Sequence, residues 1–375
     1  MKGSKIAIVF LISSLVFSLP ILSNLKPYFI TGSSLNSSIA KDTSKKFEGQ
    51  ALNIIEKCKD DSNCFKEAII ERIKKGEKVE DSIALFTKIT ESSNGMSSGC
   101  NSVGRAAGEE LFYKYGKDVF NYYSVICGHA YVYGFMIGFG KKNPNEAKGI
   151  LLKKYCLKDY NPVSCIYGAG YAISFTVRDG AEAQRSCLAL GGGLSTMNPR
   201  LTPSYQMTGP GDCILGWTSG VTDFLAIDGE PELKTFLDIC NGMTGGPLHV
   251  CLAEASFAYT FKNNPKADER IKRLEKVQQR CQKDISYECM QFLGKAVVDY
   301  LIYTLKINLK SDTMARDAAK TIERLCSGTS ATACFMGTIQ DQLTHTTHDD
   351  MMKLCSLFTL EEHRKFCFDT NLQHE

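Results

Sequence analysis

The chain has 375 residues, of which 43% are hydrophobic and 23% are charged, and this composition is typical of folded globular proteins rather than disordered ones. Its formal net charge of +3 argues against a dedicated nucleic-acid-binding protein, so we expect no nucleic-acid partner. Ten prolines are few for this length and favour long helices, whereas sixteen cysteines point to an oxidising compartment.

The first 25 residues predict an export signal or a membrane anchor. Lys2 and Lys5 precede an uncharged run over residues 6–25. This run is long for the apolar part of a cleaved signal and just long enough to span a membrane as a helix. A buried core helix is a third reading. Either of the first two places the rest of the chain outside the cytoplasm, secreted or anchored to the membrane.

Residues 26–46 read as a polar linker, in which Asn36 heads a candidate glycosylation sequon. The remainder divides into an N-terminal helical group over residues 47–140, middle repeats over 141–264 and C-terminal repeats over 265–375. In the N-terminal group we expect helices over about 47–58, 64–75, 80–92, 100–115 and 119–139. The segment 100–139 is rich in Gly and aromatic residues, which favours a buried aromatic core, with a ligand-stacking groove as the alternative.

The sixteen cysteines fall into eight pairs of neighbours along the chain. The pairs are Cys58 with Cys64, Cys100 with Cys127, Cys156 with Cys165, Cys187 with Cys213, Cys240 with Cys251, Cys281 with Cys289, Cys326 with Cys334, and Cys355 with Cys367. Structural zinc sites usually place two to four residues between near ligands, and that spacing does not occur here. We therefore predict disulfide bonds between neighbours, inferred from proximity.

The surroundings of the close pairs repeat. The first Cys ends an amphipathic segment, such as residues 265–283, whose basic side chains we expect to face solvent. The second Cys opens the next segment, and a Gly follows Cys165, Cys213 and Cys334 by three residues. Because Gly weakens a helix interior, its recurrence predicts close approach to a neighbouring helix. The second cysteines recur at steps of 48, 38, 38 and 45 residues, in the range of helix-pair solenoids.

This pattern resembles the cysteine-rich, tetratricopeptide-like repeat proteins of bacterial secretomes, over about residues 145–340. The matching stretches are Lys154-Tyr155-Cys156 to Gly168, Arg280-Cys281 to Gly294, and Leu325-Cys326 to Gly337. The chain departs from the family pattern in its uneven period, its lack of a Gly-x-Gly turn and its long central loop. The resemblance implies a curved array that binds peptides, proteins or cell-wall fragments, and it brings no catalytic motif.

Two segments interrupt the repeats. Residues 191–212 hold five Gly and three Pro and predict a long loop, closed at its base by a bond between Cys187 and Cys213. The loop is either a disulfide-held insertion or a binding loop or lid. Residues 173–178 alternate as a strand would, but we expect them to continue the preceding helix.

Few residues offer chemistry. His345, His348 and Asp349 are weak candidates for a metal site, but Thr347 followed by two acids favours a helix N-cap at the same place. His129 follows Cys127 and His249 precedes Cys251 by two residues each, and either could be a general base, although a structural role is favoured. The acids Asp223 and Glu254 lie in apolar segments, so they either are buried with a raised pKa or face solvent.

The sequence therefore predicts an all-α array of helix pairs stapled by disulfides, with no cofactor and no assigned catalytic residue. The function we expect is an extracytoplasmic, non-catalytic binding or scaffolding module with a protein or peptide partner. One alternative is an accessory or cap subunit of a membrane-bound complex, held by residues 6–25. The other is an enzyme or small-ligand binder, for example of cell-wall fragments, built around residues 191–212.

Overall fold

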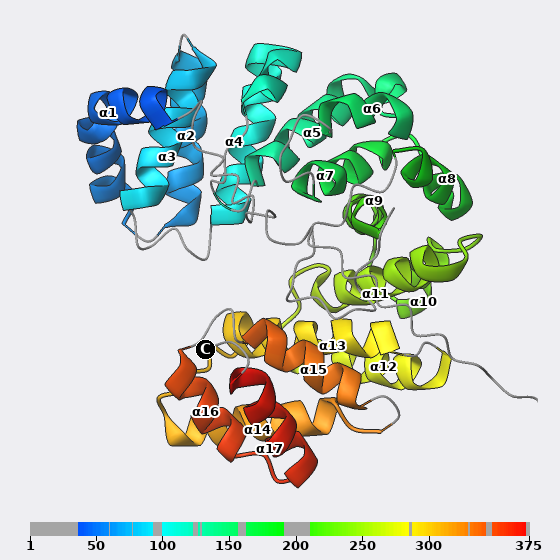
Figure 1. Ribbon diagram of the computed structural model, residues 1–375. Helices are drawn as coiled ribbons and strands as arrows, with labels where there is room; N and C mark the ends of the chain where they lie inside the picture. The colour runs from blue at the N-terminus through cyan, green and yellow to red at the C-terminus, as the bar shows by residue number, and fades with distance from the viewer. Residues whose placement is uncertain are drawn as a thin grey trace, which may run out of the picture. The chain divides into compact units, whose positions relative to one another are not determined.

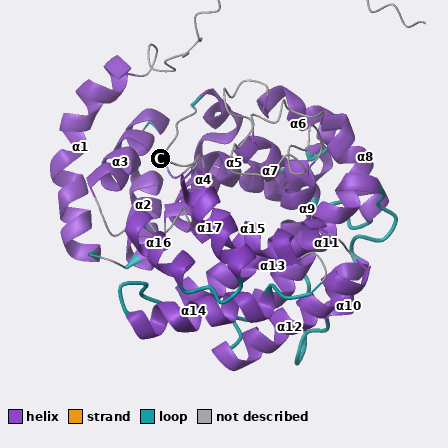
Figure 2. Ribbon diagram, turned by 60° about the horizontal axis from the view of Figure 1, so that its bottom comes forward, coloured by secondary structure: helices purple, strands orange, loops and turns teal. Residues whose placement is uncertain are grey.

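The structure is a computed structural model. It describes residues 37–59, 61–76, 78–92, 100–122, 127, 130–156, 163–190, 211–284, 287–328, 331–342 and 347–372. The chain divides into a short unit, residues 1–42, and a large unit, residues 43–375. Every regular element in the described ranges is helical, which confirms the predicted all-α class (Figures 1 and 2).

The first elements are α1 (Ser37–Cys58), α2 (Ser62–Lys75), α3 (Val79–Ser92), α4 (Cys100–Tyr115), the 3-10 turn η2 (Gly116–Asn121), α5 (Ala130–Lys142) and the 3-10 turn η4 (Pro144–Glu146). Next come α6 (Gly149–Cys156), α7 (Val163–Ile173), α8 (Gly180–Leu190), α9 (Gly211–Asp223), α10 (Leu233–Asp238) and α11 (Gly245–Phe261). The last are α12 (Ala267–Asp284), α13 (Tyr287–Asp299), the π-helical turn η6 (Tyr300–Thr304), α14 (Asp312–Leu325), α15 (Ala331–Gln342), α16 (His348–Ser356) and α17 (Glu361–Leu372).

Three expectations need correction. The helix α1 begins at Ser37, within the stretch predicted as a linker. The predicted helix over 119–139 is right only for its second half, because Gly116 adopts a positive φ of 63°, residues 116–121 form the 3-10 turn η2, and α5 starts only at Ala130. The predicted helix over 173–178 is also wrong, since α7 ends at Ile173 and the chain turns over residues 174–176.

The chain from α6 onward forms six successive helix pairs, α6/α7, α8/α9, α10/α11, α12/α13, α14/α15 and α16/α17. In each pair a disulfide links the C-terminal end of the first helix to a cysteine in the first or second turn of the second helix. A further bond joins the end of α1 to α2 in the same way. The bond between Cys187 and Cys213, although wider in sequence, is therefore the same kind of staple as the close pairs.

All eight predicted disulfides are confirmed, and the described chain has no free cysteine. The bonds join Cys58 to Cys64, Cys100 to Cys127, Cys156 to Cys165, Cys187 to Cys213, Cys240 to Cys251, Cys281 to Cys289, Cys326 to Cys334, and Cys355 to Cys367. Each bond typically contributes about 2–4 kcal/mol by restricting the unfolded chain.

The expectation that the second cysteine opens its helix holds for some pairs and needs correction for others. Cys289 lies in the first turn of α13, as predicted, and its Sγ bonds to Cys281 of α12. Cys367 instead lies near the middle of α17, because that helix already begins at Glu361. Cys251 likewise lies in the second turn of α11, which begins at Gly245. In these two pairs the second helix starts before its cysteine and runs past the end of the first helix.

One bond, between Cys100 and Cys127, is of a different kind. It joins the start of α4 to a residue just before α5. It therefore links two neighbouring helices that are not a first and a second helix of one pair.

The second helices pack side by side in one layer. The order of neighbours is α2, α4, α5, α7, α9, α11, α13 and α15, and the first helices pack against this layer (Figure 1). We call these eight helices the second-helix layer. Burial is greatest here: Trp217 of α9 is fully buried, as are Phe112, Phe135 and Phe139 of α4 and α5. The predicted aromatic core of segment 100–139 is therefore present in its described part.

Glycines let the backbones of this layer touch. A Cβ placed on Gly216 of α9 would lie 2.7 Å from the carbonyl carbon of Tyr167 in α7, and nearer still to its oxygen. A Cβ on Gly337 of α15 would lie 2.9 Å from the carbonyl carbon of Gln291 in α13. Real Cβ atoms essentially never come this close to backbone. The glycines that follow Cys213 and Cys334 therefore allow the close approach of helices that their recurrence predicted.

The basic face of α12 is only partly solvated. Arg270 and Arg273 are buried, with relative exposures of 6% and 2%, contrary to the expectation that these side chains face solvent. Arg273 donates to the carbonyl oxygens of Tyr259 (3.0 Å) and Lys262 (2.7 Å), where α11 ends. The arginine completes the backbone hydrogen bonding of the preceding helix, and for this reason it turns inward.

Eight disulfides are typical of proteins in an oxidising, extracytoplasmic compartment. Within the described ranges no helix combines the length and the apolar character that a membrane span requires. Residues 6–25, on which the predicted signal or anchor falls, lie outside the described residues, as does Asn36.

Candidate binding surface on the second helices

A connected set of aromatic and charged side chains crosses four neighbouring helices of the second-helix layer, α4, α5, α7 and α9. We call it the aromatic band. Its members are Arg105, Tyr133, Tyr167, Tyr171, Phe175, Arg178, Asp223 and Phe224.

Close helix contact brings these side chains together. A Cβ on Gly134 of α5 would lie 2.8 Å from the amide nitrogen of Glu109 in α4 and would also clash with the Arg105 carbonyl oxygen. On the other side of α5, a Cβ on Gly168 of α7 would lie 3.0 Å from the Cα of Tyr133. At these separations a side chain on one helix reaches groups on the next helix and the one beyond it. Gly at these positions is therefore what allows the band to form.

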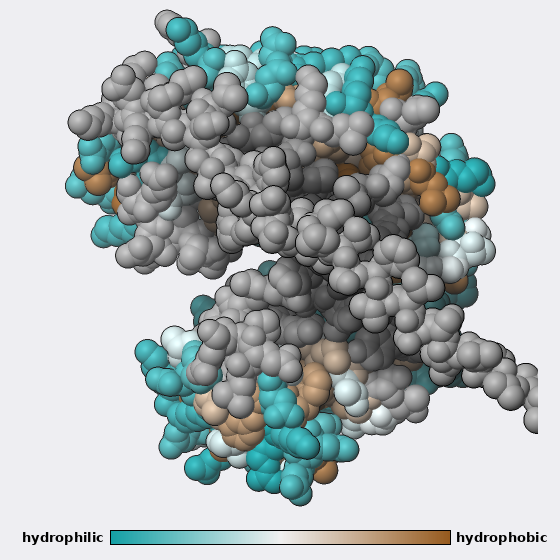
Figure 3. All heavy atoms as spheres, viewed as in Figure 1, coloured by the Kyte–Doolittle hydropathy of each residue, from teal (hydrophilic) through white to brown (hydrophobic). Residues whose placement is uncertain are grey.

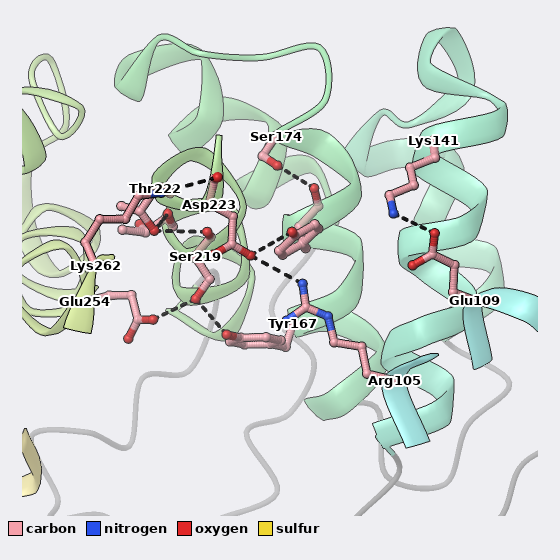
Figure 4. Close-up of polar contacts among 12 residues, drawn as sticks. Arg105, Glu109, Lys141, Tyr167, Ser174, Ser219, Thr222, Asp223, Glu254 and Lys262 are labelled. Atoms are coloured by element: carbon pink, nitrogen blue, oxygen red, sulfur yellow. Dashed lines mark hydrogen bonds and ion pairs between the residues drawn. The ribbon is translucent and has the colours of Figure 1, made fainter. Parts of the chain in front are cut away.

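Arg105 is the centre of the band. Its guanidinium carbon lies 4.8 Å from the ring centre of Tyr133 and 4.7 Å from that of Tyr171, so the cation rests against two π faces. Its Nη2 donates to Oδ2 of Asp223 at 3.4 Å, and Figure 4 shows the two side chains pointing toward each other. Burial opposes the charge of Arg105, but the tyrosines and Asp223 outweigh it, so the pKa of this guanidinium is raised.

Two parallel hydrogen bonds fix α7 against α9. The hydroxyl of Tyr171 donates to Oδ2 of Asp223 at 2.8 Å, and one helical turn earlier the hydroxyl of Tyr167 lies 2.7 Å from Oγ of Ser219. Ser219 in turn donates to Oε1 of Glu254 in α11 at 2.6 Å, so Tyr167 supplies the proton of its own bond (Figure 4). The chain of hydroxyls thus ends on a carboxylate of the next helix.

Burial controls the protonation of these groups. It raises the pKa of the Tyr133, Tyr167 and Tyr171 hydroxyls further above their ordinary value, at which they are already neutral hydrogen-bond donors at physiological pH. Burial also raises the pKa of Glu254, partly opposed by the Ser219 hydrogen bond and by Lys295. The suggestion that Glu254 is a buried acid with a raised pKa thus agrees with the structure. Asp223, by contrast, has a side chain that is 55% exposed.

The band continues past the end of α7. The rings of Tyr171 and Phe175 are 5.9 Å apart, and those of Phe175 and Phe224 are 5.0 Å apart, both edge to face. The guanidinium of Arg178 lies 4.4 Å from the ring centre of Phe224. Phe224 is 41% exposed, so this end of the band reaches solvent.

Lysines brace the band from both sides. Lys262, just after α11, donates to the carbonyl oxygen of Thr222 at 2.8 Å and so caps the C-terminal end of α9, a favourable place for a cation. Lys141 of α5 forms an ion pair with Glu109 of α4 (Figure 4). Both contacts restrain the helices that present the band.

The side chains of the band are of the types found at binding surfaces. Arginine and tyrosine held rigidly next to exposed aromatic carbon are typical of the residues that dominate protein interfaces. The hydroxyl of Ser219 donates its proton to Glu254 and accepts a hydrogen bond from Tyr167. Its surroundings therefore give it a structural role in joining three helices.

The helix N-cap predicted at Thr347 is present. The amide of Asp350 donates to Oγ1 of Thr347 at 3.3 Å, and α16 begins at His348. Asp349 lies exposed in the first turn, and His345 falls outside the described residues. Within the described ranges, no three side chains of the metal-ligating types come together.

Most of the remaining predicted positions lie outside the described residues. His129 and residues 191–210 of the predicted loop lie outside the described residues, whereas Gly211 and Asp212 open α9. His249 is half-buried in the second turn of α11. Hypotheses that place a lid or an active site on the loop are therefore not tested.

Sequence reasoning missed most of the band. Arg105 and Asp223 are 118 residues apart, and no local spacing joins them. The available signal was the regular offset of 52 residues that relates Tyr167 to Ser219 and Tyr171 to Asp223, which follows from helix pairing once the pairs are aligned.

No family model, curated protein or solved structure matches the chain. The structure shows an all-helical protein of paired helices with eight disulfides. The similarity to tetratricopeptide-like repeat proteins stays a prediction.

Proposed function

We propose that the protein is an extracytoplasmic, non-catalytic binding module of the tetratricopeptide-like kind, and that the aromatic band is its ligand surface. The observation that carries this proposal is the connected placement of ring, hydroxyl and guanidinium groups across four neighbouring helices. Part of this set stays accessible, since Phe224 is 41% exposed and the side chain of Arg105 is 37% exposed.

The dimensions of the band suit an extended polypeptide. Packed helices lie roughly 8–10 Å apart, so four neighbouring helices span about 25–30 Å. An extended chain advances about 3.3 Å per residue and would cover this length with roughly eight residues. The ligand class we propose is therefore a peptide segment or an extended segment of a protein partner.

The rigidity of the band supports binding with low entropic cost. Arg105 is held by two rings and Asp223, and Tyr167 and Tyr171 are held by hydrogen bonds to α9. Groups fixed before binding lose little freedom when a ligand arrives.

Most of the described surface in the view of Figure 3 is hydrophilic, with hydrophobic side chains gathered in a few places.

We further propose that residues 6–25 deliver the chain out of the cytoplasm, as a cleaved signal or as a retained anchor. The eight disulfides support this proposal, because such bonds persist outside the cytoplasm.

The test is selection of ligands from a randomised twelve-residue peptide library on the native, disulfide-intact protein. The dissociation constants of the enriched peptides are then measured for wild type, Phe224→Ala and the control Leu151→Ala. Leu151 has nearly the same exposure, 40%, but lies on α6, a first helix. We expect Phe224→Ala to weaken binding at least tenfold and Leu151→Ala to leave it within twofold. The proposal fails if no peptide is enriched, or if both variants bind as wild type does.

A further inference from the structure

We propose that Arg178 and Phe224 form a recognition site for an acidic side chain next to an apolar one, so that the ligand is an acidic peptide segment. This inference rests on the proposed function and specifies the chemistry of its ligand. The aromatic band holds two arginines whose guanidinium groups both lie against aromatic rings, but only Arg105 is paired with a carboxylate among the described residues.

The first arginine shows the complete arrangement. The guanidinium of Arg105 lies against the rings of Tyr133 and Tyr171, and its edge bonds to the carboxylate of Asp223. A planar guanidinium that stacks on rings leaves its N–H edge directed outward, which is the geometry that a carboxylate accepts. Here the chain supplies the carboxylate itself.

The second arginine, Arg178, lies against one ring and has no acid paired with it in the part of the chain that the structure describes. The guanidinium of Arg178 lies 4.4 Å from the ring centre of Phe224. Among the residues that the structure describes, none forms an ion pair with Arg178. The neighbouring carboxylate of Asp179 does not pair with Arg178 and instead caps α8, because its Oδ1 accepts from the amide of Glu182 at 2.8 Å.

The electrostatics of Arg178 favour an added anion. Burial lowers the pKa of this guanidinium, and only the nearby Tyr171 opposes the shift. Arg178 is exposed, and a cation that has no counter-charge among the described residues gains free energy when a carboxylate binds beside it. At Arg105, where Asp223 is present, the net shift has the opposite direction.

The backbone around Arg178 is fixed, so the site exists before the ligand arrives. The indole Nε1 of the fully buried Trp217 donates to the carbonyl oxygen of Val177 at 2.8 Å, which anchors the residue just before Arg178 to α9. Phe224 is held in turn against Phe175, with ring centres 5.0 Å apart. The partly exposed Phe224 offers an apolar contact for the residue next to the acid.

A single acidic side chain fits this site better than a polyanion does. One guanidinium can pair with one carboxylate, and the net charge of the whole chain is only +3. Nucleic acids and anionic membranes are usually bound through several cations together.

Two peptide libraries test the inference. One carries a fixed central Glu-Phe and the other a fixed central Gln-Phe, each with five randomised residues on either side. Retention of both libraries is measured on native full-length wild type, Arg178→Gln, Arg178→Lys and the control Lys142→Gln. Lys142 is an exposed cation at the end of α5, so its loss changes net charge equally.

We expect wild type and Lys142→Gln to retain the Glu-Phe library about tenfold more than the Gln-Phe library. Arg178→Gln should bring this ratio close to one while still retaining peptides, and Arg178→Lys should give an intermediate ratio. The ratio should fall as salt is added. A wild-type ratio near one, or a ratio unchanged in Arg178→Gln, overturns the acidic preference alone. Failure of wild type to retain either library overturns the proposed function as well.

Discussion

The glycine contacts of the second-helix layer lead to a prediction with an unusual sign. Replacing Gly by Ala inside a helix ordinarily stabilises it by about 1 kcal/mol. At Gly216 of α9 the new Cβ would lie 2.7 Å from the carbonyl carbon of Tyr167, where ordinary contact begins at 3.4 Å. The neighbouring atoms belong to backbone and cannot rotate away. We therefore expect Gly216→Ala to destabilise the protein.

The magnitude follows from the groups that would have to move. Overpacking of this kind costs about 1–3 kcal/mol. Separating α7 from α9 would also strain the bonds of Tyr167 to Ser219 and of Tyr171 to Asp223, worth about 1 kcal/mol each. After subtracting the helix-propensity gain, a net loss of about 2–4 kcal/mol remains. For a chain of 375 residues that lowers Tm by about 3–5 °C.

The assay is thermal unfolding followed by far-UV circular dichroism, with Gly49→Ala as the matched control. Gly49 lies in α1, and a Cβ there would meet nothing within 4 Å. The control should be as stable as wild type or more stable by up to about 1 kcal/mol, so its Tm should be unchanged or higher. If Gly216→Ala is as stable as wild type or as Gly49→Ala, the backbones do not touch as described, and the explanation of the recurrent glycines is wrong.

Three further predictions concern other parts of the molecule. Burial raises the pKa of Asp212 to about 6, so the native protein holds this proton more tightly than the unfolded chain does. The free energy of unfolding should therefore decline as the pH rises from about 4 to 6. Denaturation curves at several pH values should show that Asp212→Asn removes about 2–3 kcal/mol of this decline. Trp217→Phe leaves the Val177 carbonyl without its donor and should cost about 1–3 kcal/mol, whereas equal stability would show that the bond is unimportant. Joint replacement of Cys100 and Cys127 by Ala should lower stability by about 3 kcal/mol, and an unchanged Tm would mean that the bond does not restrain the unfolded chain.

The disulfides show what local spacing can predict. Cysteines at the end of one helix and near the start of the next are held close by a short connection, so proximity along the chain implied proximity in space. Cys187 and Cys213 obey the same rule across a longer connection. The sequence did not indicate that the bond from Cys100 to Cys127 joins the start of α4 to the residue before its neighbour α5 in the second-helix layer, because that distinction depends on which helices are neighbours.

For the glycines, the sequence predicted close contact with a neighbouring helix but not which residues they contact. Their recurrence after the second cysteines indicated close approach to a helix, but only the packing order places Gly216 on Tyr167 and Gly337 on Gln291. The same limit explains why the aromatic band was missed. Arg105 and Asp223 meet because α4, α5, α7 and α9 lie side by side, and no feature near either residue indicates the other.

The wrong predictions have local physical causes. Residues 116–121 form the 3-10 turn η2 and α5 starts only at Ala130, which the apolar pattern over 119–139 conceals. The chain turns over residues 174–176 after α7 ends at Ile173, and beyond the turn the carbonyl of Val177 accepts from the Trp217 indole, a contact that the sequence does not indicate. Arg273 of α12 turns inward because the carbonyls at the end of α11 need a donor. In these cases a local backbone conformation or a tertiary contact overrides a periodic pattern.

The most direct test of the whole account is disulfide mapping of the native protein, by proteolysis without reduction followed by mass spectrometry. The account predicts eight linked peptide pairs, seven that join a first helix to the second helix of the same pair and one that joins Cys100 to Cys127. Free thiols in the native protein, or Cys100 linked to any other cysteine, would contradict the stapled helix-pair architecture on which the binding surface depends.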